Sequence, residues 1–130
     1  MKRLTILMLL LVSTNAFAEW TRVTGSTSGE YSVYINYQSI RKMGHKVKFW
    51  TLLDFKSIQR IDKYQFMSLV NHHEYDCLEE TERTLDFIWN SGNMMSGGTV
   101  YSDNNINKET KSITPETIQE ILFNIVCSKK

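Results

Sequence analysis

Residues 47–55 read VKFWTLLDF, and the stretch alternates apolar with polar side chains as β-strands do. One side of the predicted strand carries Val47, Phe49, Thr51, Leu53 and Phe55, and the other carries Lys48, Trp50, Leu52 and Asp54. The first side is mostly apolar, so we expect it to pack against a core. The stretch therefore predicts a sheet strand with one buried face.

Similar alternation on both sides of this stretch predicts five further strands, at residues 20–24, 30–36, 66–77, 83–89 and 99–101. Turns or loops are expected at residues 25–29, 41–45, 56–63, 79–82 and 102–111, which are polar or rich in glycine and charge. Regular alternation over residues 83–89 places Arg83 on the face of Phe87 and Trp89, and Thr84 on the opposite face. Short connections between so many strands predict an antiparallel sheet.

The last part of the chain changes to a helical period. Thr114 is expected to be the N-cap residue, with Pro115 and Glu116 in the first turn. An apolar stripe at spacings of three and four follows, formed by Ile118, Ile121, Leu122, Ile125 and Val126. We therefore predict an α+β domain in which a C-terminal helix packs on one face of an antiparallel sheet of about six strands.

Residues 1–18 have the order of parts found in a secretory signal peptide. Lys2 and Arg3 precede an apolar run, and Ala16-Phe17-Ala18 forms a cleavage site before Glu19. The alternative is an uncleaved anchor, but the run of nine residues from Leu4 to Val12 spans only about half of a bilayer core. We expect residues 19–130 to form one exported domain without a transmembrane segment. Glu19 stands where a lipoprotein would carry its lipidated cysteine.

Charge and cysteine content narrow the function classes. The chain has 15 basic and 14 acidic residues, and loss of Lys2 and Arg3 leaves 13 against 14, a net charge near −1. No general attraction to nucleic acid follows from this balance. Cys77 and Cys127 are the two cysteines, and in an oxidising compartment they are expected to form a disulfide between the end of a strand and the end of the helix. Two buried free thiols are the alternative.

The segment Asn71–Cys77 holds the densest group of reactive side chains. Neighbouring residues of a strand point to opposite faces, so His72 and His73 are not expected to share a metal ion. His73 is expected on the helix-covered face as a partly buried histidine, whereas His72 shares the other face with Glu74 and Asp76. We found no nucleophile motif or nucleotide-binding loop in the sequence. We therefore expect no enzyme activity and no cofactor.

One local basic cluster is a candidate binding site for a partner. It consists of Arg41, Lys42, His45, Lys46 and Lys48, with Trp50 on the strand face of Lys46 and Lys48. A basic patch beside an aromatic side chain suits an anionic or glycosaminoglycan-like partner. The alternative is an edge strand whose lysines prevent aggregation.

Several of these features together resemble the surface-adhesin protein E family of Gram-negative bacteria. The resemblance spans nearly all of residues 19–130 and rests on Trp20, Tyr37–Arg41 with Gly44, the Val47–Asp54 strand with Trp50, Glu74–Cys77, Ser91-Gly92 with Gly97-Gly98, and Thr114–Thr117 through Val126-Cys127. It implies a six-stranded antiparallel sheet with a C-terminal helix tied to its concave face by the disulfide. It also implies a surface protein that binds extracellular-matrix and serum proteins such as laminin and vitronectin, and a homodimer.

The resulting functional hypothesis is an exported, non-enzymatic binding domain, either periplasmic or at the cell surface and without a lipid anchor. It would contact a host or envelope protein, or a polyanion, around Arg41–Trp50. Because haem binding is attributed to the type member of the resembled family, the alternative is a periplasmic carrier of a small, haem-like ligand, or an inhibitor, that uses the sheet face of His72.

Overall fold

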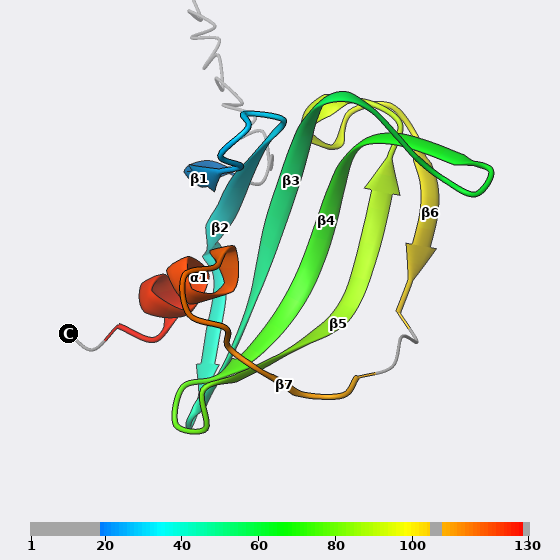
Figure 1. Ribbon diagram of the computed structural model, residues 1–130. Coiled ribbons are helices and arrows are strands. Elements are labelled where there is room, and N and C mark those ends of the chain that lie inside the picture. Colours follow the sequence, from blue (N-terminus) through cyan, green and yellow to red (C-terminus); the bar gives the residue numbers. More distant parts are fainter. Residues whose placement is uncertain (1–18, 105–107, 129–130) are drawn as a thin grey trace, which may run out of the picture.

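A strongly twisted antiparallel sheet with one helix on one of its faces forms the fold (Figure 1). The computed structural model describes residues 19–104 and 108–128. Within these residues six strands lie in the order of the chain, from β1 to β6, and a short strand, β7, pairs with the first part of β5. The predicted α+β class, antiparallel sheet and C-terminal helix are confirmed.

The strands are longer than the alternation predicted. Their bounds are Thr21–Gly25 (β1), Tyr31–Met43 (β2), Lys46–Ile61 (β3), Tyr64–Asp76 (β4), Thr81–Asn90 (β5), Thr99–Asp103 (β6) and Lys111–Ser112 (β7). A short 3₁₀ helix, η1, covers Asn93–Met95, and the α-helix, α1, covers Ile118–Val126. At the β2–β3 turn the strands run up to Gly44, whose φ of 62° is a conformation that glycine adopts readily.

The predicted loop over residues 56–63 is wrong. β3 continues to Ile61 and turns through Asp62 and Lys63 directly into β4, with Arg60 opposite Gln65 and Ile61 opposite Tyr64. These residues carry no clear alternation because both faces of this hairpin end are largely exposed. Backbone pairing rather than burial holds the extended conformation there.

An irregularity in β5 changes which residues share a face. The register between β4 and β5 shifts between His72, which pairs with Asp86, and His73, which pairs with Thr84. Arg83 consequently lies on the face opposite Phe87, and the faces predicted for Arg83 and Thr84 are wrong. A β-bulge of this kind reverses the alternation on one side of the irregularity, and side-chain polarity gives no warning of it.

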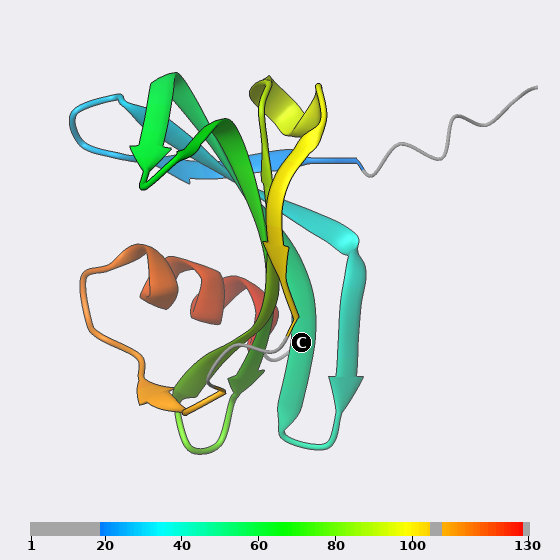
Figure 2. The same cartoon turned by 90° about the vertical axis from the view of Figure 1, so that its right-hand side faces the viewer.

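The main core lies between α1 and one face of the sheet, which we call the helix face (Figure 2). Its fully or almost fully buried members are Ile35, Val47, Phe49, Tyr75, Leu122 and Val126. The opposite face, here called the outer face, is not covered by the helix. On that face η1 packs at one end, where the Asp54 carboxylate accepts a hydrogen bond from the Met94 amide at 2.8 Å.

The helix begins later than predicted. Thr117 is its N-cap residue, and Glu116 has a φ of 62°, so the expected cap at Thr114 is wrong. The Thr117 hydroxyl donates to the Thr114 carbonyl at 2.6 Å instead of capping the helix. Leu122 and Val126 are buried, whereas Ile121 is 39% exposed and leaves the predicted stripe. The helix ends at Val126.

The predicted disulfide between Cys77 and Cys127 is confirmed, with 5.5 Å between the two Cα atoms. It joins the residue that follows β4 to the C-cap of α1. The signal peptide predicted for residues 1–18 lies outside the described residues. Among the residues that the structure describes, no helix is long and apolar enough to cross a bilayer.

Candidate functional site

The predicted basic cluster falls mainly on the outer face of the sheet. Residues directly opposite one another on paired strands share a face, which places Arg41, Lys48, Glu74 and Arg83 in one row across four strands. The adjoining row contains Trp50, His72 and Asp86. We call these two rows, together with Lys46, the Trp50 surface.

Glu74 is the centre of the charged row. Its side chain is only 9% exposed, and one carboxylate oxygen accepts hydrogen bonds from Arg83 Nε at 2.8 Å and Nη2 at 2.7 Å. The ammonium groups of Lys46 and Lys48 each lie 3.9 Å from this carboxylate, and their side chains are 56% and 46% exposed. The anion is therefore buried beneath cations that reach solvent.

Trp50 and His72 form a flat aromatic pair on the same surface. Their rings are parallel to within 3°, with centroids 4.4 Å apart. His72 Nδ1 lies 3.2 Å from an Asp86 carboxylate oxygen, which fixes the orientation of the imidazole. The Trp50 backbone amide donates to the Ser39 hydroxyl at 3.0 Å, so β2 also holds this segment in place.

The structure does not bring all five predicted partner-binding residues together. Lys42 pairs with buried Val47 and lies toward the helix face, beside the hollow next to Cys127. Arg41 lies on the Trp50 surface, where its guanidinium donates to the carbonyls of Gln38 and Ile40. β3 is paired on both sides, so edge protection does not explain Lys46 and Lys48.

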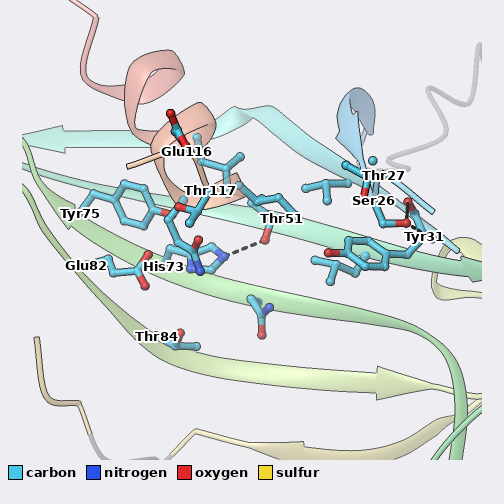
Figure 3. A pocket seen from close by; sticks show the side chains of 17 residues that line it. Ser26, Thr27, Tyr31, Thr51, His73, Tyr75, Glu82, Thr84, Glu116 and Thr117 are labelled. Atoms are coloured by element: carbon cyan, nitrogen blue, oxygen red, sulfur yellow. Dashed lines mark hydrogen bonds between the residues drawn. The ribbon is translucent and has the colours of Figure 1, made fainter. Parts of the chain in front are cut away.

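The helix face contains a feature that the sequence did not reveal. A cavity of about 620 Å³ lies between the first turn of α1 and the sheet (Figure 3). His73 lines it and shares a hydrogen bond of 2.7 Å between Nε2 and the Thr51 hydroxyl. Burial, together with the nearby His72, lowers the pKa of His73 to about 4, so the imidazole is neutral above that pH. The predicted partly buried histidine is confirmed.

Two other ionisable groups border this cavity. Tyr75 is fully buried, and its hydroxyl interacts with the carboxylate of Glu82, the residue opposite it on β5, without a hydrogen bond of ideal geometry. Burial raises the pKa of Tyr75, and the charge of Glu82 raises it further. Burial also raises the pKa of Glu82. The cavity wall is therefore polar, and Glu82 and the exposed Glu116 are the carboxylates among the described residues that line it.

Comparison with known proteins fits this architecture. Residues 20–128 match the family model described as surface-adhesin protein E. The chain belongs to the surface-adhesin protein E family. No curated protein matches the chain by sequence.

Solved structures of protein E from Haemophilus influenzae have the same fold as this protein E family member. Crystal form II of that protein is 17% identical, with a TM-score of 0.65 over 84% of this chain and 87% of the other. Protein E from non-typeable Haemophilus influenzae is 16% identical, with a TM-score of 0.65 over 88% and 79% of the two chains. At this identity the likeness concerns the fold.

Sequence reasoning missed two residues that shape the sites of this family member. Arg83 joins the Trp50 surface only because of the bulge in β5, and no sequence signal marked it. Tyr75 was placed on the helix face, but its approach to Glu82 depends on the register between β4 and β5. The alternation of β4 located both His72 and His73 correctly.

Proposed function

We propose that residues 19–130 form an exported, non-enzymatic binding domain that uses the Trp50 surface to contact an extracellular-matrix or envelope protein, or a polyanion attached to one. The observation that carries this proposal is the arrangement of Lys46, Lys48 and Arg83 around the buried carboxylate of Glu74. Membership of the adhesin family supports a binding role.

The charged row suits an anionic partner because its cations are held in place without being withdrawn from solvent. The shortest contact of the Glu74 carboxylate is the 2.7 Å hydrogen bond from Arg83 Nη2. The Nζ atoms of the two lysines remain 3.9 Å from the carboxylate, and their side chains are about half exposed. Sulfate or carboxylate groups of a partner could therefore approach both lysines. The Trp50–His72 pair beside them offers a flat aromatic contact, and tryptophan is enriched at the centres of protein interfaces.

The test is binding of the mature protein to immobilised laminin, vitronectin and heparin. We expect binding to at least one of them, weakening with added salt, and a loss of at least tenfold in the double variant Lys46→Glu/Lys48→Glu. Lys56→Glu is a single-charge control at the other end of β3, to be compared with Lys48→Glu alone. Absence of wild-type binding to all three would overturn the proposal.

Glu74→Gln provides a second variant with the opposite expectation. Removal of the central negative charge while the size is kept should strengthen binding to heparin, provided that circular dichroism shows an intact fold. If binding did not depend on the charge of this row, neither variant would change the affinity for heparin. The two variants together separate electrostatic recognition from loss of structure.

The alternative role, a carrier for a small ligand bound at His72, has less support. One face of the imidazole stacks on Trp50, and Nδ1 lies 3.2 Å from Asp86. Haemin titration of the wild type and of His72→Ala would distinguish this alternative, since a carrier would lose its Soret change in the variant.

The proposal also covers the location and the assembly of the protein. It includes export through residues 1–18, a location in the periplasm or at the cell surface, and the absence of a lipid anchor, which cell fractionation would check. It includes a homodimer, which light scattering would check.

A further inference from the structure

The cavity on the helix face is a second candidate site, independent of the Trp50 surface. It lies between the first turn of α1, the β1–β2 turn and the helix-facing sides of the central strands (Figure 3). Its volume of about 620 Å³ is within the range of small-molecule sites. α1 covers only part of the helix face (Figure 2). The cavity is partly open to solvent.

The lining is rich in neutral hydrogen-bonding groups. Its hydroxyl and amide side chains are Ser26, Thr27, Tyr31, Thr51, Tyr75, Thr84, Thr117, Asn71 and Gln119. No lysine or arginine occurs among the described residues that line the cavity, and His73 is neutral above about pH 4. A phosphate or carboxylate ligand would therefore have no cationic side chain to balance it.

A cationic ligand is also disfavoured. The positive end of the α1 dipole lies at the cavity, because Thr117 and Ile118 both line it. The lining has two carboxylates, Glu82 and Glu116. Glu116 is exposed to solvent, and burial raises the pKa of Glu82, which also lies near the charge of Lys111. The remaining ligand class is uncharged and able to both donate and accept hydrogen bonds.

The first turn of α1 presents backbone amide groups at the cavity. Intrahelical bonds cannot satisfy these amides, and the Thr117 side chain caps none of them. Hydroxyl groups of a ligand in the cavity could accept hydrogen bonds from them. The Tyr75 hydroxyl does not belong to this set, because its side chain is fully buried and interacts with Glu82, the residue opposite it on β5.

A stripe of contacting aromatic rings leads away from the cavity. Tyr31, in the cavity wall, contacts Phe55, with 5.7 Å between ring centroids. The stripe continues through Phe66 and Trp89 to Tyr101, with successive centroid distances of 5.9, 4.7 and 5.0 Å. Apart from buried Phe66, these rings keep intermediate exposure. The C–H faces of sugar rings stack on such aromatic surfaces while sugar hydroxyls bond to polar neighbours.

We infer that the helix face binds an uncharged oligosaccharide, whose terminal sugar occupies the cavity beside Tyr75 and the start of α1 and whose following units lie on the Tyr31–Tyr101 stripe. This site goes beyond the proposed partner contact and uses the opposite face of the sheet. A sugar satisfies the lining because each hydroxyl both donates and accepts.

The test uses defined neutral oligosaccharides of two to six units from the chito, malto and galacto series, with sulfated and sialylated counterparts. Saturation-transfer NMR and calorimetry with the mature protein should show binding of at least one neutral series, and affinity should rise as the chain lengthens from two to four units. Asn71→Ala should weaken binding at least fivefold with little loss of thermal stability, because the Asn71 side chain lines the cavity and is only partly buried. Trp89→Ala should abolish the length dependence.

Trp50→Ala is the matched control on the outer face and should leave sugar binding unchanged. If no neutral series binds, if only charged glycans bind, or if Asn71→Ala binds like the wild type, the inference is wrong. Its failure is distinguishable from failure of the proposed function, since Lys46→Glu/Lys48→Glu alters only the Trp50 surface.

Discussion

At the scale of single residues, neighbours on one strand have opposite environments. His72 lies on the outer face beside Trp50 and Asp86, whereas His73 lies under the helix and bonds to Thr51. The same alternation places charged Glu74 on the outer face and buried Tyr75 in the core. One strand therefore presents different chemistry on each face of the sheet.

The buried imidazole of His73 should make stability depend on pH. Its pKa is about 4 in the folded protein and 6.5 in the unfolded chain, so between these values the unfolded chain binds more protons. As the pH falls from about 6.5 to 4, this residue should reduce the free energy of unfolding progressively, by about 3 kcal/mol in total. Chemical denaturation of the wild type and of His73→Gln across this range measures the difference, and parallel curves would contradict it.

Glu74 should contribute to stability through the three cations around it. Glu74→Ala removes the partner of Arg83 and leaves Lys46 and Lys48 near each other, which should cost about 1–3 kcal/mol. Urea unfolding at low and high salt provides the measurement, with the loss smaller at high salt. Glu79→Ala, in the exposed turn before β5, is the control and should change stability little.

At the scale of elements, helix α1 is held on the sheet by one row of side chains. Leu122 and Val126 are at most 3% exposed, whereas neighbouring Ile121 is 39% exposed. The nine-residue helix is too short to persist alone in water. Its packing therefore decides whether the cavity beside it exists.

Shortening the side chains of buried Leu122 and exposed Ile121 should have different effects on stability. Leu122→Ala should lower the free energy of unfolding by about 2–5 kcal/mol, because it leaves a cavity in the core. The matched variant Ile121→Ala should cost less than about 1 kcal/mol. Similar losses at both positions would mean that the stripe lies elsewhere on the helix.

At the scale of the whole molecule, a single covalent bond joins the sheet to the last element of the fold. Cys77 and Cys127 are 50 residues apart in sequence, and their Cα atoms are separated by 5.5 Å. The sheet itself is built from neighbours in sequence, each strand pairing with the next. The helix is the part that needs the additional constraint.

Removal of this bond should destabilise the domain without destroying the sheet. The chain-entropy relation gives about 4 kcal/mol for a loop of 50 residues, and Cys77→Ala/Cys127→Ala should lose about 2–4 kcal/mol. Thermal unfolding gives the loss, and hydrogen exchange should show α1 opening before β3 and β4. Uniform protection across helix and sheet would contradict this order.

The sequence by itself determined the class of fold, the strand faces of residues 47–55 and 66–77, the helical stripe and the disulfide. Each of these follows from a local period or from the pairing of two cysteines. The tertiary structure decided the length of the β3–β4 hairpin, the bulge that brings Arg83 to Glu74, the start of α1 at Thr117, and the cavity beside Tyr75. These features depend on backbone pairing and on how far the helix covers the sheet, and neither leaves a periodic signature in side-chain polarity.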